Sequence, residues 1–159
     1  PETKRRTYEF HEARTNHGSS LSGCVHAIVA KELGKIEEAY HFFRDAALMD
    51  INDLKGNTSG GVHSACLGGT WMAVVNGFCG MRETGEGLAL DPVLPEAWTR
   101  LRVPLFWRGR RFEIDCDREK RRLTMWSGEP IRLRFAGETV DLRASETYET
   151  PCHVGSVDA

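Results

Sequence analysis

Residues 62–81, VHSACLGGTWMAVVNGFCGM, form a run that is apolar or small nearly all round. A helix without a polar face is buried among other elements. Gly68 and Gly69 each cost roughly 1 kcal/mol in a helix interior relative to alanine, so they indicate close approach of another backbone or a ligand. Two or three helices cannot cover such a segment. We therefore expect the helical half of this chain to lack neighbours.

The residues before this run predict a pair of amphipathic helices. Apolar side chains recur at three- and four-residue spacing in residues 21–33 and again in residues 36–47. Ser19 and Ser20 are expected to cap the start of the first helix, and Gly34 is expected to end it. The short link between the two helices predicts that they run antiparallel.

The residues after the run change their hydrophobic period from 3.6 to 2. Apolar and charged residues alternate in short stretches between residues 101 and 142, and turns that contain glycine separate the stretches. This pattern predicts a small antiparallel β-sandwich. The fold class is thus α+β, with helices in residues 1–83, a sandwich in residues 84–146 and a tail in residues 147–159. We expect poor order from Ser145 onward.

The composition is that of an ordinary globular chain. A net charge of −2, with 28% charged residues, gives no reason to expect nucleic acid or an anionic membrane as a partner. No apolar run approaches the roughly 18 residues of a membrane span. Lysine and arginine outnumber acidic residues between residues 100 and 134, but they alternate with core positions, which favours a solvated sheet face.

The five cysteines form no CxxC pair, and most of them stand in apolar patterns. We therefore expect small core residues rather than a metal site. A reducing cytoplasm is the simplest compartment for such a chain.

Two segments combine hydroxyls, glycine and a histidine at a predicted helix start. They are residues 15–22, TNHGSSLS, and residues 57–64, NTSGGVHS. Free N–H groups and the helix dipole make such a point attractive to an anion. The residues alone favour two ordinary capped helices over convergence of both segments on one phosphate.

The same segments carry a resemblance to a known family. The run Tyr8–Ser22 resembles the T-x-H-x-S-S-L-S segment of glycoside hydrolase family 65, which includes maltose, trehalose, kojibiose and nigerose phosphorylases. Four further stretches resemble landmarks of that family in the same order: Gly56-Asn57-Thr58, Gly61-Val62-His63, Gly68–Phe78, and Leu94-Pro95 with Trp98 and Arg108-Gly109. The resemblance covers nearly the whole chain and identifies it as a C-terminal fragment of a family member.

The resemblance implies a fold and a reaction. The helices would be the last of an (α/α)6 catalytic barrel, followed by the family's β-sandwich. The reaction would be inverting phosphorolysis of an α-linked disaccharide to β-glucose 1-phosphate and glucose, without a cofactor. A glutamic acid protonates the leaving oxygen while phosphate attacks from the opposite face. That acid lies upstream in the family and has no counterpart here, so this chain holds no catalytic residue.

The resemblance also assigns site residues and partners. The implied phosphate-binding residues are Ser19, Ser20, Gly61 as a backbone donor, and His63. Thr15 and His17 are weaker candidates that would shape the pocket. The partners would be an α-linked disaccharide and phosphate, and the full-length protein would form a homodimer.

Two alternatives to a phosphorylase stay open. A hydrolase of the same family would need a carboxylate base near the phosphate site. The absence of a carboxylate from Asn57 to Trp71, together with His63, favours phosphate. A non-catalytic sugar-binding or structural module built on the sandwich is the second alternative. Trp107 and Trp126 are candidates to stack on sugars there, but the residues favour core or domain-interface packing for them. The isolated chain is expected to be marginally stable and inactive, and the sequence does not identify the disaccharide.

Overall fold

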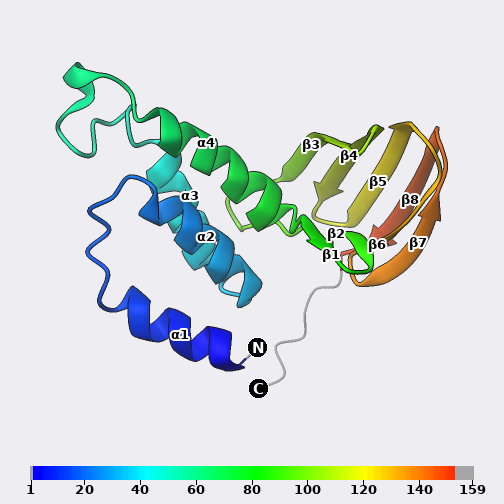
Figure 1. The fold of residues 1–159 in the computed structure, drawn as a ribbon, viewed down its shortest axis with the longest axis horizontal. Helices are drawn as coiled ribbons and strands as arrows, with labels where there is room; N and C mark the ends of the chain where they lie inside the picture. Colours follow the sequence, from blue (N-terminus) through cyan, green and yellow to red (C-terminus); the bar gives the residue numbers. More distant parts are fainter. Residues whose placement is uncertain (1, 153–159) are drawn as a thin grey trace. The chain divides into compact units, whose positions relative to one another are not determined.

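The computed structural model describes residues 2–152, and the chain divides into two compact units that meet between Gly80 and Met81 (Figure 1). The first unit is helical and the second consists of β-strands. The α+β class predicted from the change of hydrophobic period is therefore confirmed. The division falls three residues before the expected boundary after residue 83, because the strand that starts at Arg82 already belongs to the second unit.

The helical unit contains four α-helices and two shorter helical segments among its described residues. These are α1 (Glu2–Glu12), α2 (Ser22–Glu32), α3 (Ile36–Ala47), the 3₁₀ turn η1 (Thr58–Gly60), α4 (Ser64–Met72) and the π-helical η2 (Ala73–Phe78). Gly34 has φ +79° and follows the end of α2, as predicted.

The serine caps predicted for α2 are absent. The helix starts at Ser22, and Leu21 at the N-cap has helical dihedral angles and no side-chain cap. Residues 19–22 form a turn of their own, in which the Ser22 N–H donates to the Ser19 carbonyl at 3.1 Å. The Ser19 hydroxyl accepts from the Leu21 N–H at 3.3 Å and so serves this turn rather than the first turn of the helix.

The apolar run of residues 62–81 forms α4 and η2, but only part of it is buried. A Cβ added at Gly69 would lie 2.6 Å from Cys24 Sγ, so α2 approaches α4 closely at that glycine, whereas Gly68 faces open space. At least half of the surface of each of four large side chains is exposed: Val62, Leu67, Trp71 and Met72. The described helices cover only one side of α4, which agrees with the expectation that the helical half of this chain lacks neighbours.

The described residues of the β unit form eight strands in two four-stranded sheets. The strands are β1 (Arg82–Thr84), β2 (Gly87–Leu90), β3 (Arg100–Trp107), β4 (Arg110–Asp117), β5 (Lys120–Ser127), β6 (Ile131–Phe135), β7 (Glu138–Leu142) and β8 (Glu146–Pro151). Their orders are β1-β2-β6-β7 and β3-β4-β5-β8. Every pair is antiparallel except β2 and β6, which run parallel with Ala89 opposite Arg134. The intervening β3–β5 meander lets the chain enter β6 in the direction of β2, which corrects the prediction of a purely antiparallel sandwich.

Strand β8 contradicts the expected disordered tail over residues 146–151. It pairs with β5 from Lys120 opposite Pro151 to Met125 opposite Glu146. Polar residues dominate this edge strand, and only Thr150 is buried, so its sequence has no hydrophobic alternation to identify it. Backbone hydrogen bonds to β5 hold the strand in place. Residues 153–159 of the expected tail lie outside the described residues.

Ion pairs cover the outer face of the second sheet. Arg100 pairs with Asp115 at 2.6 Å, and Arg122 pairs with Asp117 at 2.9 Å. The arginines therefore neutralise acidic neighbours on adjacent strands, as expected for a solvated sheet face. Such exposed pairs are screened by solvent and add little to stability.

All five cysteines are free, and four of them are buried. Burial raises the pKa of the Cys79 thiol to about 12, which makes it an unreactive core residue. Among residues 2–152, no helix is long and apolar enough to traverse a bilayer.

Candidate functional site

Helices α2 and α4 run in the same direction, so both predicted helix-start segments lie at one end of the helical unit (Figure 1). Cys24, early in α2, lies against α4, with its Sγ 3.7 Å from the Cys66 carbonyl. Farther along both elements, Gly77 lies against Ile28. Both contacts lie progressively later along each element, so the two elements run in the same direction. The start of α2 and the start of α4 are therefore neighbours at the same end.

A cavity of about 230 Å³ lies beside the first segment. His17, Ser19 and Ser20 line it, together with Lys55 and Asp45. Lys55 comes from the loop between α3 and α4, and its Nζ donates to the His17 carbonyl at 2.9 Å. An ammonium beside two hydroxyls suits an anion, although the Asp45 carboxylate on the same wall opposes one.

His17 is part of this wall, whereas Thr15 is not. The Nδ1 atom of His17 lies 2.8 Å from Ser22 Oγ, and its ring meets the His26 ring edge to face at 4.6 Å. Burial, aided by His26, lowers the pKa of His17. The Thr15 hydroxyl donates to the His11 carbonyl at 2.7 Å and so belongs to the end of α1.

Two carboxylates form hydrogen bonds with the second segment, residues 57–64. Asp53 accepts from the Thr58 N–H at 2.9 Å and from the Thr58 hydroxyl at 2.7 Å. Asp50 accepts from the His63 N–H at 2.9 Å, and its other oxygen lies 2.5 Å from His63 Nδ1. These hydrogen bonds lower the pKa of both carboxyls. Asp50 therefore joins the two ends of the loop of residues 50–63, and Asp53 joins two positions within it.

Gly61 contributes its backbone conformation to this loop. Its φ of +120° lies in a region that other residues rarely adopt. Its N–H, which we expected to bind phosphate, donates to the Thr58 carbonyl at 3.0 Å. That N–H is therefore already engaged within the loop.

The structure thus brings the predicted residues to one end of the unit but separates them into two groups. Ser19, Ser20 and His17 line the 230 Å³ cavity, and Gly61 and His63 do not. Sequence reasoning missed Lys55 and Asp50. A cation within a Gly- and Asn-rich loop was a visible signal for Lys55, whereas Asp50 lies 13 residues from its partner and no local pattern connects them.

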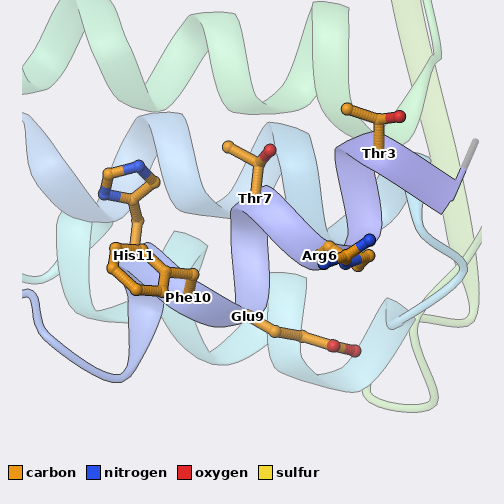
Figure 2. A pocket seen from close by; sticks show the side chains of 6 residues that line it. All are labelled: Thr3, Arg6, Thr7, Glu9, Phe10 and His11. Carbon is orange, nitrogen blue, oxygen red and sulfur yellow. The ribbon is translucent and has the colours of Figure 1, made fainter.

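A hollow on α1 contains none of the predicted residues. Its volume is about 540 Å³, and all six of its lining side chains project from this one helix (Figure 2). Such an open face offers no convergent polar groups. Within residues 2–152, no group of three or more His, Cys, Asp or Glu side chains is arranged to hold a metal ion.

Comparisons with known proteins agree on one family for both units. Residues 1–72 match the glycosyl hydrolase family 65 central catalytic domain, and residues 81–142 match the family's C-terminal domain.

Relatives from two bacteria extend the match across the chain. An alpha,alpha-trehalose phosphorylase from Geobacillus stearothermophilus is 36% identical over 97% of this chain and 20% of its own length. A kojibiose phosphorylase from Halothermothrix orenii is 43% identical over 74% of this chain and 15% of its own length.

A solved structure, provisionally described as a kojibiose phosphorylase from the human microbiome, superposes with a TM-score of 0.83 at 26% identity. The match covers 91% of this chain and 19% of that one. The chain therefore spans a fifth or less of the length of these proteins.

Proposed function

The chain belongs to glycosyl hydrolase family 65, and on that premise we propose that it is the C-terminal part of an inverting disaccharide phosphorylase. The whole enzyme cleaves an α-linked disaccharide with inorganic phosphate and releases β-glucose 1-phosphate and glucose. This chain supplies the phosphate side of the site. The general acid comes from the part of the catalytic domain that the chain does not span. Relatives named as trehalose and kojibiose phosphorylases support this assignment.

The observation that carries the proposal is the shared position of the two predicted segments. Because α2 and α4 are parallel, the Ser19–Ser20 turn and the His63 loop lie at one end of the helical unit. Lys55 adds a positive charge beside the two serines. Phosphate is an anionic nucleophile, so the protein needs to hold and orient it rather than deprotonate it.

The exposed face of α4 supports a larger helical domain. Trp71 and Leu67 are each 54% exposed in this chain. Further helices of an (α/α)6 barrel would cover such a face and bring in the missing acid. The five free cysteines agree with a cytoplasmic setting for the full-length enzyme, which we expect to be a homodimer.

Asp50 changes the argument about a hydrolase of the same family. The stretch from Asn57 to Trp71 has no carboxylate in sequence, yet in space Asp50 lies against His63. Both of its oxygens accept hydrogen bonds from His63, and these bonds lower its pKa. A carboxylate that already accepts two hydrogen bonds and has a lowered pKa is a poor base for activating water. The phosphorylase therefore remains the better assignment.

The test uses the full-length polypeptide. Release of glucose 1-phosphate and glucose is measured from maltose, trehalose, kojibiose and nigerose, with and without phosphate, for wild type and His63→Gln. Cleavage that requires phosphate is expected. Loss of a hydrogen bond to a charged ligand costs about 1.5–3 kcal/mol, so His63→Gln is expected to raise KM for phosphate roughly 10- to 100-fold.

Two results would contradict the proposal. Release of glucose without phosphate, unchanged by His63→Gln, would indicate a hydrolase whose base lies elsewhere. Sugar binding by residues 81–159 with no turnover by the full-length protein would indicate a non-catalytic module.

A further inference from the structure

We infer that Asp50 is a positioning residue, which holds both the backbone and the ring of His63 so that Nε2 is the atom presented to phosphate. The inference rests on the proposed function, because it assigns a phosphate contact to His63. Asp50 lies outside the predicted anion-binding segments, and its role is to orient the His63 ring.

The contact is a two-point clamp on one residue. One Asp50 oxygen accepts from the His63 N–H at 2.9 Å, and the other lies 2.5 Å from Nδ1. The His63 carbonyl in turn accepts from the N–H groups of Cys66 and Leu67 at 2.8 and 3.2 Å, in the first turn of α4. Backbone and ring are therefore fixed between the Asp50 carboxylate and α4.

The chemistry of the clamp determines which ring nitrogen remains available. An ionised carboxylate only accepts hydrogen bonds, so the nitrogen bonded to it carries the proton. Nδ1 is that nitrogen, and Nε2 lies on the opposite edge of the ring. Within residues 2–152 the His63 ring makes no second hydrogen bond, which leaves Nε2 open to a ligand.

The clamp is largely shielded from water. The Asp50 side chain is 12% exposed and the His63 side chain 21% exposed. Shielding strengthens a charge-assisted hydrogen bond because water competes less for either partner. The lowered pKa of Asp50 keeps the carboxylate ionised at neutral pH, as the clamp requires.

Asp53 provides a matched control on the same loop. Its carboxylate also accepts a backbone N–H and a side-chain donor, but both belong to Thr58 and neither to His63. Its φ is +46°, a conformation that asparagine tolerates well. Asp53→Asn therefore perturbs only the loop, whereas Asp50→Asn perturbs both the loop and the orientation of the His63 ring.

The experiment compares these variants in the full-length polypeptide. Asp50→Asn is expected to raise KM for phosphate roughly tenfold, because a misdirected contact loses most of its effect. KM for the disaccharide should stay within about twofold of wild type. Asp53→Asn should leave both constants within about twofold of wild type. In the His63→Gln background, Asp50→Asn should have no further effect on KM for phosphate.

A spectroscopic measurement keeps the inference testable if Asp50→Asn folds poorly. In ¹⁵N-histidine-labelled wild type, the His63 resonances should report a proton on Nδ1. Addition of inorganic phosphate should shift the Nε2 resonance and leave Nδ1 protonated. In Asp50→Asn both tautomers should be populated, because an amide can donate as well as accept.

Three results would overturn the role of Asp50. They are equal effects of Asp50→Asn and Asp53→Asn, an Asp50→Asn effect that persists in the His63→Gln background, and an Nδ1 without a proton in wild type. Failure of the proposed function has a different signature: phosphate-independent cleavage, or a KM for phosphate that His63→Gln does not change. If added phosphate does not shift the Nε2 resonance while Nδ1 stays protonated, His63 does not contact phosphate and the Asp50–His63 clamp is purely structural.

Discussion

The two units of this chain differ in how completely they bury their apolar side chains. Among residues 2–152, nine of the eleven exposed large hydrophobic residues lie in the helical unit: Phe10, Leu21, Val25, Ile51, Leu54, Val62, Leu67, Trp71 and Met72. The β unit exposes Phe106 and Trp126. Its strands find their partners within about 70 residues of chain, so their alternating faces meet each other.

The difference shows which unit leaves an apolar face uncovered. In the β unit, Phe112, Ile114, Leu123 and Met125 are fully buried by neighbouring strands. In the helical unit, α4 is covered on the side of Gly69 and open on the side of Trp71. The strands of the β unit bury their own apolar side chains, whereas the helical unit has one exposed apolar face on which further helices could pack.

The largest expected effect comes from truncating a buried aromatic side chain of the β unit, and an exposed aromatic side chain of the helical unit serves as its counterpart. Phe112→Ala should destabilise the β unit by about 3–5 kcal/mol, because Phe112 has no exposed surface and the change leaves a cavity. Trp71→Ala should change the stability of this chain by less than about 0.5 kcal/mol, because its side chain is mostly exposed. Chemical denaturation followed by circular dichroism measures both changes.

The same pair sharpens the comparison in the full-length polypeptide. There, Trp71→Ala should cost far more than in the isolated chain, since further helices would bury it. Equal, small effects of Trp71→Ala in both contexts would mean that nothing covers α4.

An intermediate effect is expected at the two adjacent glycines of α4. Gly69→Ala should destabilise the helical unit by about 1–3 kcal/mol, because the new methyl group would lie 2.6 Å from Cys24 Sγ and 2.9 Å from its Cβ. Gly68→Ala, which meets nothing within 4 Å, should stabilise the helix by up to about 1 kcal/mol. Thermal unfolding of the two variants tests the opposite signs; the same sign for both would exclude close packing of α2 on α4 at Gly69.

A smaller effect than at the two glycines is expected from Asp117 in the β4–β5 turn. Its Oδ1 accepts from the N–H groups of Glu119 and Lys120, each at 2.9 Å. These bonds, together with Arg122, lower the pKa of Asp117 to about 2. A carboxyl whose pKa is lowered by folding adds stability above its ordinary pKa and loses it as the pH falls toward the lowered value.

Asp117→Asn should therefore cost at most about 1 kcal/mol at neutral pH, because the exposed group is screened by solvent. The difference from wild type should shrink between about pH 4 and pH 2. Melting curves at several pH values measure it; a constant difference down to pH 2 would show that the turn gains nothing from the ionised carboxyl.

Prediction from the sequence succeeded where the signal was periodic. Alternation located β3 to β7, and the spacing of apolar residues located α2 and α3. It failed at β8, whose residues are mostly polar, and at the Ser19–Ser20 cap, where a local turn competes for the serine oxygen. Periodicity records burial, so an edge strand held by backbone hydrogen bonds leaves no trace in it.

In the candidate site, too, some residues stand in local sequence patterns and others are identified only by the folded structure. Ser19, Ser20, Gly61 and His63 stand in recognisable segments that open two helices. Asp50 and Lys55 could not be assigned from spacing, because the path of the α3–α4 loop decides which side chains they meet.

The sequence by itself determined the α+β division, most of the strands and the family, since each depends on patterns carried by neighbouring residues. Only the tertiary structure decided that α2 and α4 run in parallel, that Asp50 clamps His63, that Lys55 joins the two serines, and that α4 is left half covered. The physical reason is range: periodicity and turn chemistry act over a few residues. A hydrogen bond or a packed face joins residues that the chain brings together only after it has folded.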